Sequence, residues 1–207
     1  MRKLASIIIP CYNHARFLEE TVGSALASTY RPLEIIIVDD GSADESFKIA
    51  RKLSTEYPEV RCIQQPNGGP AKARNEGIRE AKGFYILPLD ADDLISPAYL
   101  EQGIQLLETK PGVKVVYAKA RKFGAVNKEW KLKPWSRKNL AMDNMIYVSA
   151  IFRKEDWQKA GGFTENTVLV REDWEFWIKM LKDEGSAVCM SFVGFFIAYT
   201  KVPGEKV

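Results

Sequence analysis

The segments Ser6-Ile-Ile-Ile-Pro-Cys-Tyr-Asn13 and Ile35-Ile-Ile-Val-Asp-Asp-Gly-Ser42 share one pattern, in which an apolar, β-branched run ends in polar residues. Residues 84–89 form a third apolar run, which ends at Asp90. Runs that are apolar at nearly every position are typical of strands covered on both faces by helices. These segments therefore predict a parallel sheet with polar side chains at the carboxyl ends of its strands.

Amphipathic segments separate the apolar runs. Residues 15–27, 44–57 and 70–82 have apolar side chains at helical spacing, and residues 60–64 are a further short strand. Alternating strands and helices predict an α/β fold of the Rossmann type, a mostly parallel sheet flanked by helices in three α/β/α layers.

The pattern is looser after residue 93. In chain order we expect a helix over 97–108, a strand over 113–118, a long loop or short hairpin over 121–144, a strand over 147–152, a helix over 154–160, a helix over 172–183 and a last strand from 191. The segment 121–144 is polar, basic and rich in tryptophan, and a long loop in a compact domain is often functional.

Composition narrows the class of protein. With 207 residues, 46% of them hydrophobic, we expect one domain. The 30 basic and 27 acidic residues are mixed along the chain. The sequence has no basic helix of the kind that binds nucleic acid. The cysteines Cys11, Cys62 and Cys189 lack paired spacing, which favours reduced thiols of a cytoplasmic protein. Neither a signal peptide nor an apolar stretch of about 20 residues is present in this sequence.

Acidic residues follow two of the apolar runs. Asp39 ends one, and Asp90, Asp92 and Asp93 follow another. A single Asp in such a place can simply begin a turn or cap a helix. Ligands of open α/β sheets, however, bind outside the carboxyl ends of the strands. Clustered carboxylates repel one another and favour a cation, and oxygen ligands alone suit Mn²⁺ or Mg²⁺.

Four motifs in this order resemble the inverting family 2 glycosyltransferases of GT-A fold. They are Ser6-Ile-Ile-Ile-Pro-Cys-Tyr-Asn13, Ile35-Ile-Ile-Val-Asp-Asp-Gly-Ser42, Gly69-Pro-Ala-Lys-Ala-Arg-Asn75 and Leu89-Asp-Ala-Asp-Asp93. The resemblance covers about residues 5–200. It implies one catalytic domain, with a nucleotide-binding half over about 1–93 and an acceptor half over about 94–207.

The resemblance also implies roles for single residues. Those around the base, ribose and diphosphate of a nucleotide-sugar donor, with a UDP-sugar favoured, would be Pro10, Tyr12, Asp39, Arg74, Asp90 and Ala91. Within the D-x-D motif Asp92 would face the metal, with Asp90 beside it and Asp93 as a substitute. Gly68-Gly69 before a helix could alternatively bind an anion directly, but we favour a turn near the nucleotide.

A second pair of segments resembles the acceptor half of the family. These are Gly161-Gly-Phe-Thr-Glu165 and Arg171-Glu-Asp-Trp-Glu-Phe-Trp177. Asp173 would be the general base that takes the acceptor's proton, with Glu172 beside it. The alternative is that both carboxylates only favour a helix N-terminus. His14, the one histidine, is expected to be a loop residue.

The sequence therefore predicts a metal-dependent glycosyltransferase that inverts the anomeric carbon. Its acceptor would be a glycan or lipid-linked glycan, in surface polysaccharide or glycoconjugate synthesis. Such an acceptor could bring the protein to the inner face of the membrane. The alternatives are a nucleotide- or glycan-binding module without turnover, and a nucleotidyltransferase, which would have a glycine-rich first loop. Members of the family commonly continue past the last strand with a basic, histidine-containing segment that contacts the diphosphate, whereas this sequence ends soon after Lys201. Either Lys201 supplies part of that contact, the chain is truncated, or the diphosphate contact is weak.

Overall fold

The computed structural model describes residues 1–165 and 171–199. The strands are β1 (Ala5–Cys11), β2 (Leu33–Asp39), β3 (Val60–Gln64), β4 (Tyr85–Pro88), β5 (Leu94–Ile95), β6 (Val113–Gly124), β7 (Lys128–Trp130), β8 (Ile151–Arg153) and β9 (Ser186–Tyr199). The helices are α1 (Ala15–Leu26), α2 (Ser46–Glu56), α3 (Pro70–Glu80), α4 (Tyr99–Thr109), α5 (Arg137–Met142), α6 (Lys154–Ala160) and α7 (Glu172–Leu181).

One sheet runs through the molecule in the order β3-β2-β1-β4-β8-β6-β9-β5, and β7 pairs with β6. The ladders between β3, β2, β1 and β4 are parallel, as is the long ladder of β6 with β9. β8 is antiparallel to both β4 and β6. Most paired residues thus belong to parallel ladders, which confirms the predicted sheet type.

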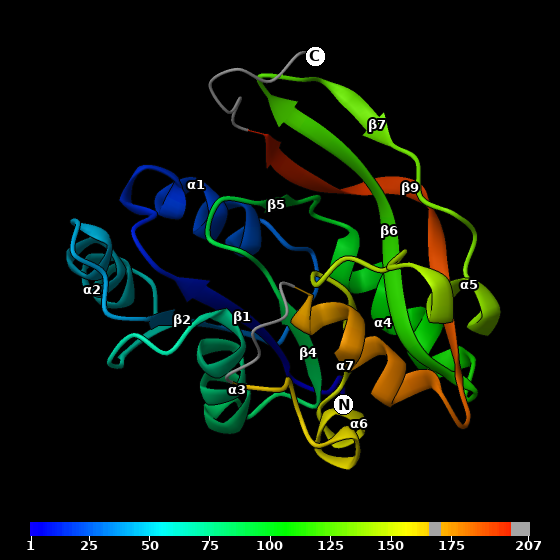
Figure 1. The fold of residues 1–207 in the computed structure, drawn as a ribbon. Helices are drawn as coiled ribbons and strands as arrows, with labels where there is room; N and C mark the ends of the chain where they lie inside the picture. The colour runs from blue at the N-terminus through cyan, green and yellow to red at the C-terminus, as the bar shows by residue number, and fades with distance from the viewer. Residues whose placement is uncertain (166–170, 200–207) are drawn as a thin grey trace.

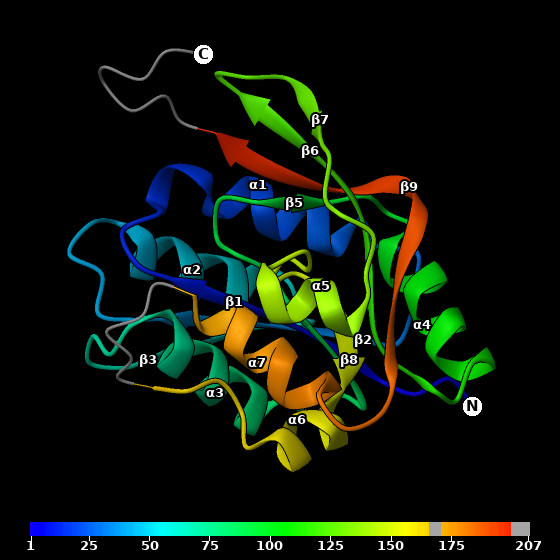
Figure 2. The same ribbon diagram turned by 45° about the vertical axis from the view of Figure 1, so that its right-hand side comes forward.

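Helices cover both faces of the sheet, in the three layers expected from the sequence. Figures 1 and 2 show α1 and α2 on one face and α3, α6 and α7 on the other. The side chains of β1 and β2 explain this arrangement, because Ile7, Ile8 and Ile9 and then residues 35–38 are all fully buried. A strand with no exposed face requires a helix on each side.

The predicted elements up to residue 120 are confirmed within a few residues, and the later ones differ more. Of the alternatives for residues 121–144, the hairpin is confirmed, because β6 extends to Gly124 and turns into β7. Two short elements were not predicted, β5 and α5. β9 begins at Ser186, earlier than expected.

The predicted strand over 147–152 was wrong in its first half, because only Ile151–Arg153 pairs as β8. Residues 146–149 are buried, but side chains bond two of their backbone carbonyls. The Tyr99 hydroxyl donates to the Ser149 carbonyl at 2.6 Å, and the Trp177 indole donates to the Ile146 carbonyl at 3.0 Å. An apolar run can therefore be buried without joining a ladder.

No helix among the described residues is long and apolar enough to cross a membrane.

Two helical glycines give a matched test of how tightly the layers pack. A Cβ added at Gly77 in α3 would meet the Cγ2 methyl of Ile8 and lie 3.0 Å from Cγ2 of Val38. A Cβ added at Gly23 in α1 would meet nothing within 4 Å. We expect Gly77→Ala to lower the free energy of unfolding by about 1–3 kcal/mol through overpacking. Gly23→Ala should raise it by up to about 1 kcal/mol through helix propensity. Urea denaturation measures both, and equal changes would contradict the packing described for α3.

Candidate active site

A first cavity of about 470 Å³ lies at the carboxyl ends of β1 and β4, beside the start of α3. Six of the predicted site residues line it: Pro10, Tyr12, Arg74, Asp90, Ala91 and Asp92. Two others, Asp39 and Asp93, are buried and are not part of its lining. The motifs from three strand ends and one helix therefore meet at one place, as the parallel topology requires.

Reciprocal hydrogen bonds join the loops that follow β1 and β2. The amide of Asn13 donates to the Ser42 hydroxyl at 3.0 Å, and the Asn13 side chain accepts from the Ala43 amide at 2.8 Å. Asn13 has a φ of 57°, a left-handed conformation that asparagine tolerates better than most residues. The neighbouring Tyr12 is 47% exposed, so its ring is open to a ligand in the cavity.

Asp40, which was not singled out in the sequence, shapes the turn before α3. Its carboxylate accepts from the amides of Gly68 at 2.9 Å and Gly69 at 2.8 Å, and from the Gln65 side chain at 2.6 Å. The anion at this helix N-terminus is thus the protein's own carboxylate. This arrangement confirms that Gly68-Gly69 forms a turn beside the cavity.

Asp39 is fully buried behind this turn. Its Oδ2 accepts from the Ser42 amide and from Gln64 Nε2, both at 3.3 Å. Its Oδ1 has no hydrogen-bond partner among the described residues. A buried acceptor without a partner is unusual in proteins and marks a place where a ligand N–H would be stabilised.

Arg74 lies between the first cavity and α7. One guanidinium nitrogen donates to Asp90 at 2.8 Å and another to Glu172 at 2.7 Å, with the Arg74 side chain 5% exposed. Burial alone would lower the pKa of Arg74, but the charges of Asp90 and Glu172 raise it overall. Arg74 is therefore a buried cation that joins Asp90 of the D-x-D motif to Glu172, the neighbour of Asp173.

The three D-x-D carboxylates have different surroundings. Asp90 is paired with Arg74, and Asp92 Oδ2 lies 3.8 Å from His14 Nε2 in the cavity wall. Asp93 is 6% exposed and accepts from the Ala198 amide of β9 at 2.9 Å. Burial raises the pKa of both Asp92 and Asp93, and the charge of Asp90 raises them further.

These residues fit a metal only together with a diphosphate. Within residues 1–165 and 171–199 no group of three or more Asp, Glu, His or Cys side chains could hold an ion by itself. Mg²⁺ in nucleotide sites, however, is usually held by one or two carboxylates together with phosphate oxygens. Asp92 and Asp90 line the cavity and suit that donor set, whereas Asp93 is directed to β9.

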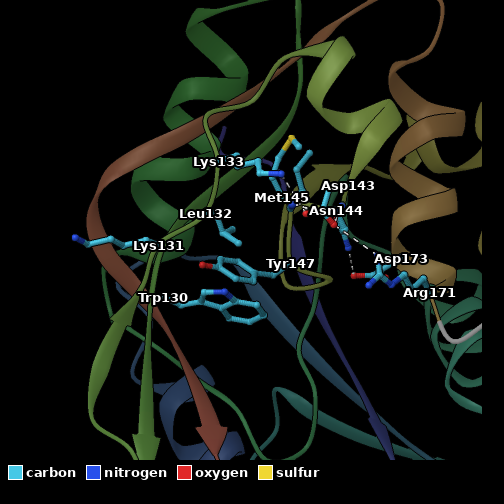
Figure 3. A pocket seen from close by; sticks show the side chains of 11 residues that line it. Trp130, Lys131, Leu132, Lys133, Asp143, Asn144, Met145, Tyr147, Arg171 and Asp173 are labelled. Carbon is cyan, nitrogen blue, oxygen red and sulfur yellow. Dashed lines mark hydrogen bonds and ion pairs between the residues drawn. The ribbon is translucent and has the colours of Figure 1, made fainter. Parts of the chain in front are cut away.

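A second cavity, of about 430 Å³, lies at the start of α7, where Arg171 and Asp173 line it (Figure 3). β7 and the chain after it form one wall, from Trp130 to Lys133. Tyr147 lies beside Trp130 on this side, and Asp143, Asn144, Arg171 and Asp173 line the opposite side. Asp173 lines this cavity, while the neighbouring Glu172 is bonded to Arg74.

Asn144, which was also missed in the sequence, holds the Asp173 carboxylate. Its side-chain amide donates to Asp173 Oδ2 at 2.8 Å, and the Trp174 amide donates to Oδ1 at 2.8 Å. Burial raises the pKa of Asp173, and the charge of Glu172 adds to this, while Arg74 and the two hydrogen bonds act in the opposite direction. Asp173 and Glu172 do begin α7, so the helix-terminus interpretation describes their place but not their partners.

Asn75 fixes the Gly161-Gly-Phe-Thr-Glu165 segment against α3. Its amide nitrogen donates to the Phe163 carbonyl and to Glu165, both at 2.8 Å. Its oxygen accepts from the Phe163 amide at 3.0 Å. A Cβ at Gly162, which has a φ of 74°, would lie 2.9 Å from that oxygen, so glycine is required there. The sequence signal was the Asn at the end of the Gly69–Asn75 motif. Lys201, the expected contact to the diphosphate, lies outside the described residues.

Comparison with known proteins gives a consistent assignment. The family model for Glycosyl transferase family 2 matches residues 6–176. Chondroitin synthase of Pasteurella multocida is 31% identical over 181 residues, which are 86% of this chain and 19% of that protein. The chain thus spans about a fifth of the length of this curated relative.

Two solved structures share the fold. S. aureus TarS in complex with UDP-GlcNAc has a TM-score of 0.79 at 20% identity, over 100% of this chain and 62% of that one. The mannosyltransferase PcManGT of Pyrobaculum calidifontis, in complex with GDP-Man and Mn2+, has a TM-score of 0.76 at 21% identity, over 98% and 59% of the two chains. With a family match over most of its length and a GT-A-type fold, this chain belongs to glycosyl transferase family 2.

Proposed function

We propose that this protein transfers a sugar from a nucleotide diphosphate donor to an acceptor hydroxyl, with inversion at the anomeric carbon. The observation that carries the proposal is the ion-paired cluster of Asp90, Arg74 and Glu172. It connects the lining of the first cavity, which includes Asp90 and Asp92, to Asp173, which follows Glu172 and lines the second. The lining of the first cavity comes from residues 10–92 and that of the second from residues 130–173. This division supports a donor half and an acceptor half within one catalytic domain.

The donor would occupy the first cavity. Tyr12 offers an exposed ring for packing against the base, and the unpaired Oδ1 of Asp39 would accept a base N–H that reached it. Asp92, with Asp90 beside it, would hold Mn²⁺ or Mg²⁺ against the diphosphate. When bound, such an ion neutralises charge on the leaving diphosphate. A UDP-sugar is favoured, and two proteins of the same fold are described in complex with UDP-GlcNAc and GDP-Man.

Asp173 would act as the general base. The acceptor oxygen forms a bond to the anomeric carbon, and the bond from that carbon to the diphosphate breaks with its electrons on the diphosphate. The hydroxyl proton passes to the Asp173 carboxylate. A single displacement of this kind inverts the anomeric centre. Glu172 would act indirectly, by holding Arg74 and so the position of α7 against the donor side.

For the acceptor and the place of the reaction in the cell, we propose only a general class. Curated relatives include chondroitin and hyaluronan synthases, which favours a glycan or lipid-linked glycan acceptor in surface polysaccharide or glycoconjugate synthesis. A lipid-linked acceptor would place the protein at the inner face of the membrane. The cysteines Cys11, Cys62 and Cys189 are free thiols, which agrees with the cytoplasmic side.

The base assignment predicts a change in turnover without a change in donor binding. After UDP, GDP and dTDP sugars are screened with Mn²⁺ for nucleotide release, Asp173→Asn should lower turnover with the best donor by about 10²–10⁴-fold. UDP affinity should stay nearly unchanged, because proton removal belongs to the transition state. Glu172→Gln should lower turnover less than Asp173→Asn does. Asp183→Asn, on an 81% exposed carboxylate just beyond α7, is the control. Parental turnover in Asp173→Asn would refute the assignment.

The metal assignment predicts a difference between neighbouring carboxylates. UDP binding by calorimetry should strengthen when Mn²⁺ replaces a chelator, and Asp92→Asn should remove most of that gain. Asp93→Asn should keep it, because the Asp93 carboxylate is bonded to β9 and does not line the cavity. Equal UDP affinity with and without Mn²⁺ in the parental protein would exclude this metal site.

The pH profile tests the surroundings of Asp173. The carboxylate must be charged to accept a proton, so turnover should rise with pH along an acidic limb. Burial raises the pKa of Asp173, which places this limb above the ordinary Asp value of 3.8. Asn144→Ala removes a hydrogen bond that favours the charged form, so it should move the limb to still higher pH. The neighbouring charges, Glu172 and Arg74, are unchanged in this variant. A limb that stays in place would contradict a role for Asn144 in holding the base.

A further inference from the structure

Basic residues are concentrated in one segment of this nearly neutral chain. Residues 119–138 contain eight of the 30 basic residues and one of the 27 acidic ones, Glu129. The rest of the chain therefore has 22 basic and 26 acidic residues and is net negative. This segment includes the C-terminal half of β6, all of β7 and the chain that forms one wall of the second cavity. We call residues 119–138 the basic ribbon.

The basic ribbon brings positive charge to the second cavity. Lys131 and Lys133 are among its lining residues, and Arg171 lies across the cavity from them beside Asp173. The Lys133 side chain is directed toward the cavity, whereas the Lys131 ammonium points away from it (Figure 3). Lys133 and Arg171 both lie 3.6 Å from Asp143, and their side chains are 65% and 60% exposed. These are long, exposed ion pairs of the kind that contributes little to stability. A ligand anion could thus engage the two cations at little expense to the fold.

An aromatic surface lies beside these charges. Trp130 is 40% exposed, and its ring packs on Tyr147 at a centroid distance of 5.2 Å. Tyr147 in turn packs on the buried Phe195, also at 5.2 Å. Figure 3 shows the Trp130 and Tyr147 rings side by side beneath Leu132. The Trp130 ring is therefore held in place by the core while part of it remains open to a ligand.

We propose that the second cavity and the basic ribbon bind an acidic oligosaccharide, a glycan chain with carboxylate groups whose sugar rings pack on Trp130. This inference rests on the proposed function and specifies its acceptor class. Aromatic rings offer apolar area to the C–H faces of sugars, and the cations select for negative charge along the chain. A hydroxyl at the end of such a chain would then lie near Asp173, which lines the same cavity.

An anionic membrane surface is the alternative ligand for a basic segment of this kind. Residues 130–133 of the basic ribbon line a concave cavity, whereas binding to a bilayer surface needs apolar side chains on an exposed, projecting face. Among the described residues, the large exposed apolar side chains near this cavity are Trp130 and Met142. Trp130 lies within the cavity lining, so the glycan is the better match to this surface.

The test is direct binding without donor or metal, so that it does not depend on transfer. Calorimetry compares an acidic tetrasaccharide of alternating glucuronic acid and N-acetylglucosamine with chitotetraose, a neutral chain of equal length. The parental protein should bind the acidic tetrasaccharide more tightly, and this preference should shrink between low and high salt. The double variant Lys131→Gln, Lys133→Gln should bind it about 3- to 30-fold more weakly. Trp130→Ala should weaken both chains, and Trp130→Phe should restore most of the binding.

Lys110→Gln is the matched control, because Lys110 is an exposed lysine at the opposite end of β6. It should bind both tetrasaccharides like the parental protein. Equal affinity for the two chains, or no effect of the double lysine variant, would overturn the proposal. The proposal would also be overturned if the protein bound neither tetrasaccharide but sedimented with phosphatidylglycerol vesicles, and if the double lysine variant lost this sedimentation. A protein that binds the acidic chain but transfers no sugar would instead overturn the proposed function and leave this inference standing.

Discussion

The buried ion pairs of Arg74 are the interaction on which the site depends. A guanidinium with 5% exposure of its side chain is tolerated because Asp90 and Glu172 both accept hydrogen bonds from it. Removing either carboxylate would leave the buried Arg74 charge with only one of its two ion-pair partners. Loss of a partner from a buried ion pair is strongly destabilising in proteins. Since α3 carries Arg74, the end of β4 carries Asp90 and α7 carries Glu172, this cluster sets the position of three elements around one point.

The same cluster connects the linings of the two cavities, because Arg74 and Asp90 line the first and Glu172 precedes Asp173 of the second. Asp90 and Glu172 both bond Arg74, so one positive charge is shared between two carboxylates. Asp92 lines the first cavity and Asp173 the second, each with a pKa raised by burial. An arrangement of this kind keeps one acidic group for the leaving diphosphate and another for the attacking hydroxyl, as the proposed transfer requires.

Polar side chains that are buried or half-buried shape the loops around these groups. Asp40 holds the turn before α3, Asn75 holds the Gly161-Gly162 segment, and Asn144 holds Asp173. Each of them bonds backbone or side-chain groups far away in the sequence. Because unpaired polar groups are costly inside a protein, such bonds specify one loop conformation among many. These side-chain hydrogen bonds fix the loop backbones in place, as the ladder hydrogen bonds do for the strands.

Much of the fold could be predicted from the sequence because its signals are local. The apolar runs of β1, β2 and β4 and the amphipathic helices between them require only the residues themselves, and parallel topology then brings Tyr12, Asp90 and Asp92 to one edge. The partners of the site residues could not be predicted, because they are distant in the chain. Arg74 and Glu172 are 98 residues apart, Asp93 and Ala198 are 105 apart, and Asn144 and Asp173 are 29 apart. The sequence alone determined which carboxylates stand at the strand ends, and only the tertiary structure decided which cavity or backbone amide each of them faces.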